Sequence, residues 1–411
     1  MGTRALQYDV VIVGAGWAGI GVSRTLKDAG YRHVVYERNR ICETWRTQRW
    51  SSFRMNTPNV LTVMPGEQYG GDEPEGYMTC GEFIDMVEGY AKHHNLPVLE
   101  NVPVTEVRQI GPDFEIVTGT GTAVAHNVVI ATGNLNVPRR PKLNTELPKS
   151  IHQIDGSEYW DANALAPGAV LVIGCGNSGG QIAEDLARSG RSVFLSSGKN
   201  GRIPRRYRGR DIYVWLVENG RMSKPRTAST GRPLIGATHT ISLQSLSAQG
   251  VVLLGRFEHV LPDGTMTFAD SLSDSVAFGD QVSEEIRHDV DSYIELIGID
   301  APEAVPDIAE SVSGRFPDPP IRQLDLVGAG ITTVVWSTGY TGDFSWLRVP
   351  GVIDQGGSPL QEKCVSVPGI YFAGLDTSES LAAGTVLAVE EECRRIVDHI
   401  REHRDKRHNP A

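Results

Sequence analysis

Two glycine-rich turns, each placed between an apolar run and a helical pattern, constrain the fold of this chain most. The first turn, GAGWAG at 14–19, follows the apolar run YDVVIV at 8–13. The second turn, GCGNSG at 174–179, follows VLVI at 170–173. Short continuous apolar runs are typical of buried parallel strands, and a glycine turn that opens onto a helix is typical of a nucleotide-binding βαβ unit. The sequence therefore predicts an α/β fold with two Rossmann-like units.

The residues after both turns continue the same pattern. Apolar residues recur at helical spacing, with Ala18, Val22, Leu26 and Ala29 in the first unit and Ile182, Ala183, Leu186 and Ala187 in the second. The runs HVVYE at 33–37 and SVFL at 192–195 then predict the second strand of each unit. Both units are complete, so the chain is expected to bind two dinucleotides.

The first unit ends in an acid. Gly14 permits a tight turn, Gly16 leaves room for a pyrophosphate, and Gly19 lets the helix pack closely on the strand, while the helix N-terminus attracts the phosphates. Glu37 lies where a carboxylate binds the hydroxyls of an unphosphorylated ribose. A glycine pattern also occurs in turns without a ligand, but the strand, helix and acid around this one favour an adenine dinucleotide.

The second unit ends in hydroxyls and cations instead. Ser197 follows Gly174 at the same separation as Glu37 follows Gly14, and Ser196 precedes it. Four basic residues come next, namely Lys199, Arg202, Arg205 and Arg206. A ribose 2′-phosphate is repelled by a carboxylate and bound by such donors, so this unit is predicted to hold NADP(H). The alternative is a solvated basic loop that binds nothing.

An adenine-dinucleotide site beside an NADP(H) site indicates a flavoenzyme, in which hydride passes from the nicotinamide to FAD. Two segments end in Thr-Gly, VVIATGN at 128–134 and TTVVWSTGY at 332–340, and such turns suit crossings between domains. Near the C-terminus, a strand, a Gly-Leu-Asp turn and a long helix place Asp376 at a strand end. The predicted organisation is a FAD-binding domain in two parts, 1–160 and 332–411, with an NADP-binding domain, 161–331, inserted between them.

Composition excludes other classes of function. The net charge is −11, which argues against nucleic acid or an anionic membrane as a partner. No run approaches the roughly 18 apolar residues of a membrane span, and the N-terminal sequence shows no leader pattern, so a cytoplasmic location is expected. We find no metal-binding motif and no Ser-His-Asp pattern. A homodimer is the default expectation for the assembly.

The longer motifs resemble those of one family. ERNRICETWRTQRWSSFRMNTPN at 37–59, PGEQY at 65–69 and RRYRGRD at 205–211 are similar to class B flavin-dependent monooxygenases, which include flavin-containing and indole-pyruvate monooxygenases. Within that family they look most like a bacterial subgroup that carries a potassium-transport flavoprotein label. The resemblance implies two Rossmann-like domains, FAD, NADPH, molecular oxygen and a small-molecule substrate.

The glycine units and this resemblance together predict the cofactor-binding residues. The full set is Gly14, Gly16, Trp17, Gly19, Glu37, Arg38, Trp45, Arg46, Asn56, Thr57, Val104, Ala131, Thr132, Gly133, Gly174, Gly176, Asn177, Ser178, Gly179, Ser196, Ser197, Lys199, Arg205, Arg206, Thr338, Gly339 and Asp376.

Asn56 is the predicted catalytic residue. The resemblance implies that reduced flavin and oxygen form a C4a-(hydro)peroxyflavin, which an asparagine beside the flavin and retained NADP⁺ protect. A neutral amide can donate a hydrogen bond there without protonating the intermediate. The alternative is that Asn56 only caps a turn before Pro58. The predicted reaction is N-, S- or C-oxygenation of an amine, a sulfide or a small keto acid. The alternative enzyme is an NADPH-dependent flavin oxidase or dehydrogenase that passes electrons to oxygen, a quinone or a partner.

Some positions depart from the family pattern. Cys42 and Glu43 replace the usual Gly-Gly, and the Baeyer–Villiger linker motif keeps only His152, which is either a linker residue or a core imidazole. Lactone formation is therefore not favoured. The five cysteines, Cys42, Cys80, Cys175, Cys364 and Cys393, contain no CxxC pair, which argues against a disulfide reductase.

Overall fold

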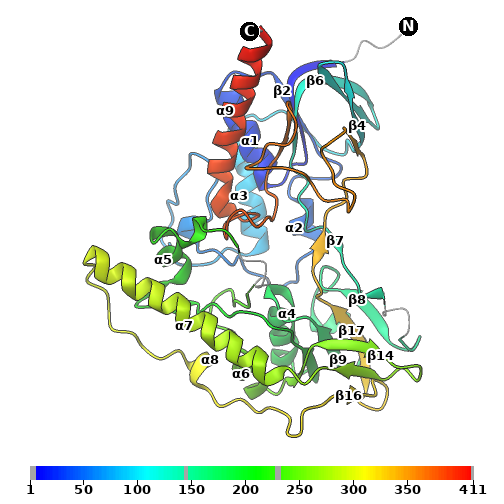
Figure 1. Cartoon of the computed structure of the whole chain (residues 1–411), viewed down its shortest axis with the longest axis vertical. Coiled ribbons are helices and arrows are strands. Elements are labelled where there is room, and N and C mark those ends of the chain that lie inside the picture. Colours follow the sequence, from blue (N-terminus) through cyan, green and yellow to red (C-terminus); the bar gives the residue numbers. More distant parts are fainter. Residues whose placement is uncertain (1–5, 143–146, 227–232, 409–411) are drawn as a thin grey trace.

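Two lobes, each built around a sheet, form the molecule in the computed structural model, which describes residues 6–142, 147–226 and 233–408. Figure 1 shows the first lobe, with β1, β2, β4 and β6, above the second, with β8, β9 and β17. The C-terminal helix α9 lies in the first lobe although it follows the second lobe in sequence. The predicted nested arrangement of two Rossmann-like domains is confirmed.

The first lobe contains an eight-stranded sheet in the order β19-β4-β5-β6-β1-β2-β3, with β20 beside β6. Strands β1, β2, β3, β6 and β20 pair in parallel, and β4, β5 and β6 form an antiparallel meander. The strands are β1 Leu6–Val13, β2 His33–Tyr36, β3 Val98–Leu99, β4 Val104–Ile110, β5 Asp113–Thr118, β6 Gly121–Ile130, β19 Leu347–Arg348 and β20 Ile370–Phe372. Since β19 and β20 come from the end of the chain, this lobe is discontinuous in sequence.

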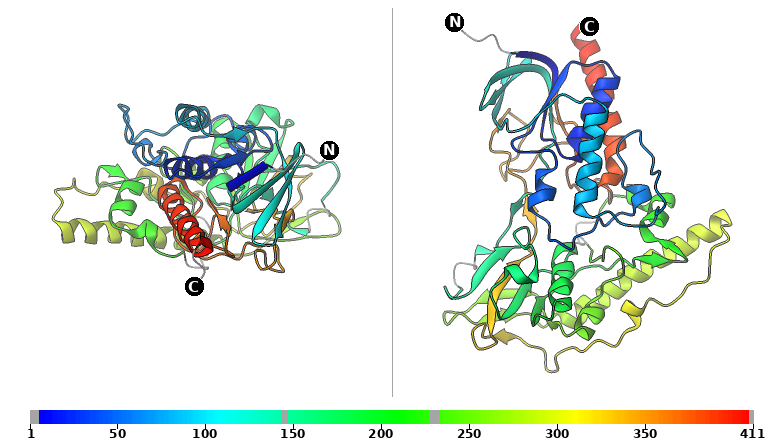
Figure 2. Two further views of the ribbon diagram at one scale, coloured as in Figure 1. Left: turned by 90° about the horizontal axis from the view of Figure 1, so that it is seen from above. Right: turned by 180° about the vertical axis from the view of Figure 1, so that it is seen from behind.

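Helices α1 (Trp17–Asp28), α3 (Cys80–His93) and α9 (Val389–His408) cover this sheet, and α1 packs on both of the others. The view from behind in Figure 2 shows them side by side. The short helices α2 (Glu43–Thr47) and η1 (Asn59–Leu61) follow β2. The predicted C-terminal helix begins later than expected, because residues 373–385 form a loop that ends in η5 (Val386–Ala388). Asp376 therefore lies in a loop between β20 and η5.

The second lobe contains a five-stranded sheet in the order β13-β10-β9-β17-β8, with every pair parallel. Its strands are β8 His152–Asp155, β9 Ala169–Ile173, β10 Val193–Ser196, β13 Val252–Leu254 and β17 Ile331–Trp336. Its helices are η3 Ala162–Ala164, α4 Asn177–Arg188, α5 Ile212–Glu218, η4 Arg221–Ser223, α6 Leu243–Ala248, α7 Leu272–Ile297 and α8 Ile308–Ser311. A small antiparallel sheet joins β14 Phe257–Val260, β15 Met266–Phe268 and β16 Gln323–Leu324.

The second sheet extends beyond the predicted limits of 161–331. Strand β8 pairs with β17, and β17 pairs with β9, so 152–155 and 331–336 both belong to this sheet. The predicted ranges 1–160 and 332–411 place these strands in the first domain. The structure differs from this prediction because the strands pair with segments that are distant in the sequence. A two-stranded ladder of β7 (Val137–Pro138) and β18 (Tyr340–Thr341) follows, and Figure 1 shows β7 between the lobes.

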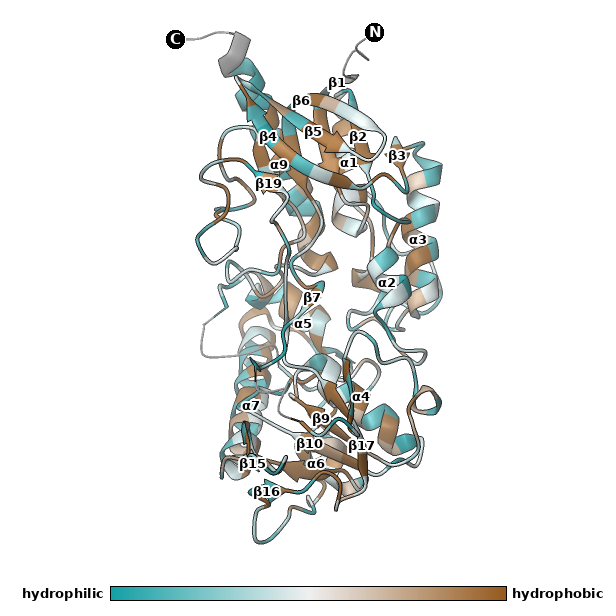
Figure 3. Cartoon of the chain, turned by 90° about the vertical axis from the view of Figure 1, so that its right-hand side faces the viewer, coloured by the Kyte–Doolittle hydropathy of each residue, from teal (hydrophilic) through white to brown (hydrophobic). Residues whose placement is uncertain are grey.

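Both sheets have apolar interiors. Val10, Val11 and Ile12 of β1 and Val170 and Leu171 of β9 are fully buried, as expected for parallel strands covered on both faces. Figure 3 shows the central strands of both lobes mostly brown, whereas the helices are banded with teal. A further ladder joins β11 (Arg206–Tyr207) to β12 (Arg210–Asp211). Within the described ranges, we find no helix that is long and apolar enough to cross a membrane.

Candidate cofactor and active site

The two glycine turns have equivalent backbones. The Gly14 N–H donates to the Tyr36 carbonyl at 2.8 Å, and the Gly174 N–H donates to the Ser196 carbonyl at 3.0 Å. Helices α1 and α4 begin after Gly16 and Gly176, and neither has a side-chain cap. In contrast, α3 has a full capping box at Thr79. The first N–H groups of α1 and α4 are therefore left for a ligand, as at other phosphate-binding helix termini.

Close packing explains the third glycine of each turn. A Cβ added to Gly19 would overlap the carbonyl oxygen of Gly14, and a Cβ added to Gly179 would overlap that of Gly174. In contrast, a Cβ added to Gly16 meets no protein atom within 4 Å, so this position opens onto space. These are the separate roles that the turn pattern predicts for its glycines.

A Thr-Gly segment forms the next wall of each turn. The Ala131 N–H, directly after β6, donates to the Val13 carbonyl at 2.8 Å, and the Ser337 N–H, directly after β17, donates to the Ile173 carbonyl at 2.8 Å. Residues 131–133 therefore lie beside the first turn, and 337–339 lie beside the second. The Thr338 hydroxyl donates to the Arg139 carbonyl, which ties the second segment to the strand crossing between the lobes.

Unpaired polar atoms surround both turns. Trp17 Nε1 and Thr132 Oγ1 beside the first turn, and Asn177 Oδ1 and Ser337 Oγ beside the second, are buried without a hydrogen-bond partner among the described residues. Buried polar atoms in folded proteins are normally paired. A nucleotide carries phosphate, hydroxyl and amide groups that would pair them, so both turns fit the dinucleotides predicted from the sequence.

Strand register makes Glu37 and Ser197 equivalent in position. Val13 pairs with Tyr36 in the first unit, and Ile173 pairs with Ser196 in the second, so Glu37 and Ser197 each follow the strand by one residue. The Glu37 carboxylate accepts from the Ala15 N–H at 2.8 Å and the Asn39 N–H at 2.9 Å. A carboxylate has about four acceptor sites. Glu37 therefore keeps capacity to bind ribose hydroxyls at the edge of the glycine turn.

Arg38 and Val104 lie close to Glu37 in the fold. Arg38 follows it directly and is exposed. The Val102 N–H donates to the Glu37 carbonyl at 2.8 Å, and Val104 starts β4 two residues later. Val104 is half-buried against the apolar side of the first lobe. Both residues therefore lie on the side of the first unit that contains Glu37.

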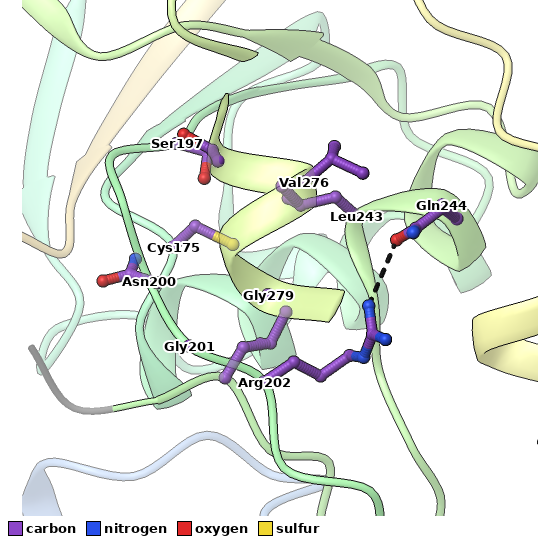
Figure 4. Close-up of a pocket in the computed structure, with 11 residues that line it drawn as sticks. Cys175, Ser197, Asn200, Gly201, Arg202, Leu243, Gln244, Val276 and Gly279 are labelled. Atoms are coloured by element: carbon purple, nitrogen blue, oxygen red, sulfur yellow. Dashed lines mark hydrogen bonds between the residues drawn. The ribbon is translucent and has the colours of Figure 1, made fainter. Parts of the chain in front are cut away.

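The second unit contains a cavity beside Ser197 (Figure 4). Ser197, Asn200, Arg202 and Gln244 supply polar groups to it, and α7 closes one side through Val276 and Gly279. Ser196 does not line it. Its hydroxyl donates to the Gly255 carbonyl at 2.9 Å and accepts from the Phe257 N–H at 3.0 Å. Of the predicted pair Ser196 and Ser197, only Ser197 therefore lines this cavity.

The predicted basic residues are not equally available. Arg202 pairs with Asp280 and Glu310, Arg205 with Asp211, and Arg206 with Glu75. Lys199 is exposed and lies over the Phe278 ring at 4.7 Å, without a carboxylate partner among the described residues. A paired arginine contributes less net charge to a phosphate site. The geometry thus favours Lys199 over Arg205 and Arg206, a distinction that charge in the sequence does not make.

Arg256 is a further cation that the sequence analysis missed. The Ser196 hydroxyl, at the end of β10, hydrogen-bonds to the Gly255 carbonyl and to the Phe257 N–H. Arg256 lies between these two residues in the chain and is therefore close to the end of β10. Its side chain is 67% exposed, and its NH2 lies 3.6 Å from Glu258 Oε1. Only the pairing of β10 with β13 brings it near Ser197, and no local motif marks it.

Aromatic residues fill the region after Glu37. The Trp45 ring contacts Trp17 at 5.9 Å, Phe53 at 5.9 Å and Phe83 at 4.6 Å between centroids. Arg46 Nε donates to the Ile41 carbonyl at 3.2 Å, and Arg46 also pairs with Glu88. Because Trp17 begins α1 at the first glycine turn, this cluster brings Trp45 next to that turn. Trp45, a predicted cofactor-binding residue, and the predicted phosphate site are therefore neighbours.

Asn56 lies where the two lobes meet. Its side-chain oxygen accepts from Gln181 Nε2 of α4 at 3.0 Å, and its carbonyl accepts from Arg205 NH1 at 2.7 Å. The Tyr77 hydroxyl donates to Asp211, the partner of Arg205, at 2.6 Å. Thr57 next to it is buried and its hydroxyl contacts Thr62 Oγ1 at 2.7 Å. Asn56 therefore does more than cap a turn, and its two partners, Gln181 and Arg205, were not predicted because they come from distant segments.

Two other predicted positions are fixed by local contacts. The Asp376 N–H donates to Asn134 Oδ1 and its carbonyl accepts from Asn134 Nδ2, both at 2.9 Å, which places Asp376 beside the first Thr-Gly segment. Arg226 pairs with the Asp376 carboxylate at 2.7 Å. His152 is exposed on the edge strand β8, so it is not a core imidazole.

The thiols are inert in this environment. Burial raises the pKa of the Cys42 thiol to about 12 and that of the Cys175 thiol to about 12. All five cysteines are free. Since the thiolate is the reactive form in disulfide exchange, these groups do not suit that chemistry at neutral pH.

Comparison with known proteins agrees with this geometry. A family model described as pyridine nucleotide-disulphide oxidoreductase matches residues 11–215. The chain is similar to an oxidoreductase, CzcO-like, of Geobacillus kaustophilus, at 28% identity over 96% of this chain and 99% of that protein. It is similar to indole-3-pyruvate monooxygenase YUCCA8 of Oryza sativa subsp. indica, at 28% identity over 45% of this chain and 47% of that protein.

Among solved structures, a flavin-containing monooxygenase from Stenotrophomonas maltophilia has the same fold, with a TM-score of 0.67 and 17% identity over 97% of this chain and 99% of that one. The fold and the two glycine turns define a flavoprotein oxidoreductase with two dinucleotide-binding lobes. The chain is thus similar to flavin-dependent oxidoreductases and monooxygenases, in agreement with the resemblance that its motifs carry.

Proposed function

We propose that this protein is an FAD- and NADPH-dependent monooxygenase that forms a C4a-(hydro)peroxyflavin and oxygenates a small organic substrate. Its place among NADPH-dependent flavoprotein enzymes, and the predicted pair of cofactors, are confirmed at the level of the family. The oxygenating chemistry and the role of each residue are proposals of this article.

The observation that carries the proposal is the position of Asn56. It comes from the first lobe, two residues before Pro58, and its amide oxygen accepts from α4, the helix of the second glycine turn. A residue with this geometry can contact groups bound to both lobes. An oxygenating flavoenzyme needs a hydrogen-bond donor in addition to its two nucleotide sites. This donor must lie where the nicotinamide, the flavin and oxygen react.

The residues of the first lobe are assigned to FAD. The N-terminus of α1 receives the pyrophosphate, and Glu37 receives the adenosine ribose. Trp17 and Thr132 offer the unpaired donors described above, and Trp45 and Arg46 lie in the segment beside that turn. Residues 131–133 and Asp376 lie at the border of this proposed FAD site.

The residues of the second lobe are assigned to NADPH. The N-terminus of α4, with Asn177 and Ser178, receives the pyrophosphate. Ser197 and Lys199 are assigned to the 2′-phosphate, with Arg256 as an additional donor. The chemistry that bound FAD would supply is acceptance of a hydride from NADPH and transfer of the electrons to oxygen. The protein orients the two nucleotides and presents the Asn56 amide between them.

The substrate class proposed is a soft nucleophile such as an amine or a sulfide, or a small keto acid. Indole-3-pyruvate, a keto acid, appears in the name of the rice relative, and that relative matches less than half of this chain.

The test is to reduce the purified flavoprotein with NADPH without air and then admit oxygen in a stopped-flow spectrometer. A C4a adduct that forms before reoxidation is the expected result. Direct reoxidation with release of peroxide and no adduct would contradict the proposal and favour the alternative, a flavin oxidase or dehydrogenase.

The role of Asn56 has its own test in the Asn56→Ala variant. We expect NADPH consumption to continue while peroxide rises and product falls, because the donor at the oxygenated flavin is lost. Removal of one such donor costs about 100-fold or more in other enzymes. An unchanged ratio of product formed to NADPH consumed would mean that Asn56 has only a structural role.

A further inference from the structure

We propose that Gln181 is a positioning residue that fixes which edge of the Asn56 amide faces the cofactors. The inference rests on the proposed role of Asn56. It assigns a role to a side chain of α4 that hydrogen-bonds to Asn56 of the first lobe.

The hydrogen bonds of Gln181 determine the orientation of both amides. Gln181 Nε2 donates to the Ile235 carbonyl at 2.7 Å and to Asn56 Oδ1 at 3.0 Å. A main-chain carbonyl can only accept, so the atom of Gln181 that contacts Ile235 must be the nitrogen. The two N–H groups of Gln181 Nε2 donate to the two acceptors, the Ile235 carbonyl and Asn56 Oδ1. The Asn56 atom facing Gln181 is then the oxygen, and the two donors of Asn56 Nδ2 point away from Gln181.

Burial makes this orientation costly to reverse. Gln181 is 8% exposed, on the buried side of α4, while Asn56 is half-buried. Rotating the Gln181 amide would oppose its oxygen to the Ile235 carbonyl and leave buried polar groups unpaired, which is unfavourable. Gln181 therefore holds the Asn56 amide in one of its two possible orientations.

The main chain of Asn56 is fixed by the same lobe. Arg205 NH1 donates to its carbonyl at 2.7 Å, and Arg205 is held by the fully buried Asp211. Tyr77 from the first lobe donates to Asp211 at 2.6 Å and lies against the Arg205 guanidinium, 4.7 Å from ring centroid to Cζ. The backbone and the side chain of Asn56 are thus both set by residues of the second lobe.

This orientation has a chemical consequence. With its oxygen occupied by Gln181, Asn56 offers donors to a bound ligand, which stabilise electron-rich oxygen or a nicotinamide carbonyl. The reverse orientation would offer lone pairs and repel the same groups. Gln181 belongs to the second lobe, which is assigned to NADPH. Through Gln181, this lobe orients the hydrogen-bond donor of Asn56 at the proposed oxygen-reacting site.

The direct test uses Gln181→Glu, which keeps the shape but leaves an ionised side chain that can only accept. We expect Asn56 to reverse and to donate to the new carboxylate. In protein labelled with [¹⁵N]asparagine, the Asn56 side-chain amide resonance, identified by its loss in Asn56→Ala, should shift downfield. An unchanged Asn56 resonance in Gln181→Glu would overturn the inference. The measurement uses the oxidised protein at rest and does not depend on turnover.

The functional test compares peroxide released per NADPH consumed. We expect this ratio to rise about tenfold in Gln181→Glu, the size of effect seen when supporting residues of active sites are removed. The matched control is Ser52→Ala, which removes another hydrogen bond between the first lobe and α4, from Ser52 Oγ to Asp185 at 2.6 Å, without touching Asn56. An equal rise in Ser52→Ala would mean that Gln181 only tethers the lobes, and the inference would be wrong.

The outcomes separate this inference from the proposed function. If Asn56→Ala uncouples the enzyme and Gln181→Glu does not, Gln181 has no positioning role while Asn56 keeps its own. If Asn56→Ala changes nothing, the proposed role of Asn56 fails, and the amide resonance still decides the orientation. Should Gln181→Glu not fold, Gln181→Met removes both hydrogen bonds at similar size. It should then give an Asn56 amide that exchanges between two orientations, and a single unshifted resonance would overturn the inference.

Discussion

The two βαβ units of this chain share one backbone and differ at one equivalent position. In both, an uncapped helix follows the glycine turn, the third glycine packs on the carbonyl of the first, and a Thr-Gly segment forms the next wall. Glu37 in the first unit and Ser197 in the second then occupy the same register. We propose that the shared backbone forms a phosphate site in each unit, and that the side chain after the second strand decides which ribose each site accepts.

The largest effect in this comparison should come from the shared backbone. Gly19→Ala forces a Cβ onto the Gly14 carbonyl, so we expect the free energy of unfolding to fall by about 3 kcal/mol and FAD to be lost. Gly179→Ala should damage the second lobe in the same way. Thermal unfolding and the flavin content of the purified protein measure both.

Gly16→Ala is the matched control for this prediction, because its Cβ meets no protein atom within 4 Å. The apoprotein should keep its stability within about 0.5 kcal/mol, while FAD affinity falls because the methyl group enters the pyrophosphate space. If Gly16→Ala and Gly19→Ala destabilise the apoprotein equally, the two glycines do not have the separate roles assigned to them.

The next effect should come from exchanging the residue that distinguishes the units. Ser197→Glu gives the second unit the acid of the first, so we expect the preference for NADPH over NADH to fall roughly 100-fold. Hydrogen bonds to charged groups contribute about 1.5–3 kcal/mol, and each 1.4 kcal/mol is a factor of ten. The ratio of kcat/KM for the two nucleotides measures it. Ser197→Ala, which removes the hydroxyl without adding charge, should change the ratio by about tenfold or less. If the Ser197→Glu variant used NADPH as well as the unchanged protein, Ser197 would not be part of the 2′-phosphate site.

The sequence predicts the two units better than the contact between them. Continuous apolar strands and three glycines are local signals, and so the turns, α1, α4 and the equivalence of Glu37 and Ser197 could be read directly. Strands β8 and β17 join the second sheet by long-range pairing, which no local pattern reports. The partners of Asn56 lie 125 and 149 residues away in the chain, so Gln181 and Arg205 gain their roles only through packing. Charge in the sequence likewise cannot separate the buried, paired Arg205 from the exposed Lys199.

A smaller effect is expected from the acid of the first unit. Glu37→Ala should raise the Kd for FAD about tenfold, because the ribose hydroxyls lose their acceptor, and should leave the KM for NADPH unchanged. Titration of apoprotein with FAD, followed by flavin fluorescence, measures it. Glu43→Ala is the control, since Glu43 forms an exposed pair with Arg40 on α2. A parallel change in the KM for NADPH would show that Glu37 acts through the whole fold and not through one ribose.

The smallest effect should come from the two thiols next to the glycine turns. Cys42 precedes α2 in the first lobe, and Cys175 lies within the second turn; burial raises the pKa of each to about 12. At pH 8 only about one thiol in 10⁴ is then ionised, and the thiolate is the form that attacks. Alkylating reagents at pH 8 should therefore leave both residues unmodified by mass spectrometry and the rate of NADPH oxidation unchanged. Rapid alkylation of Cys42 with loss of activity would contradict this. It would reveal a reactive thiol beside the first turn and make the two units differ in chemistry as well as in the ribose they bind.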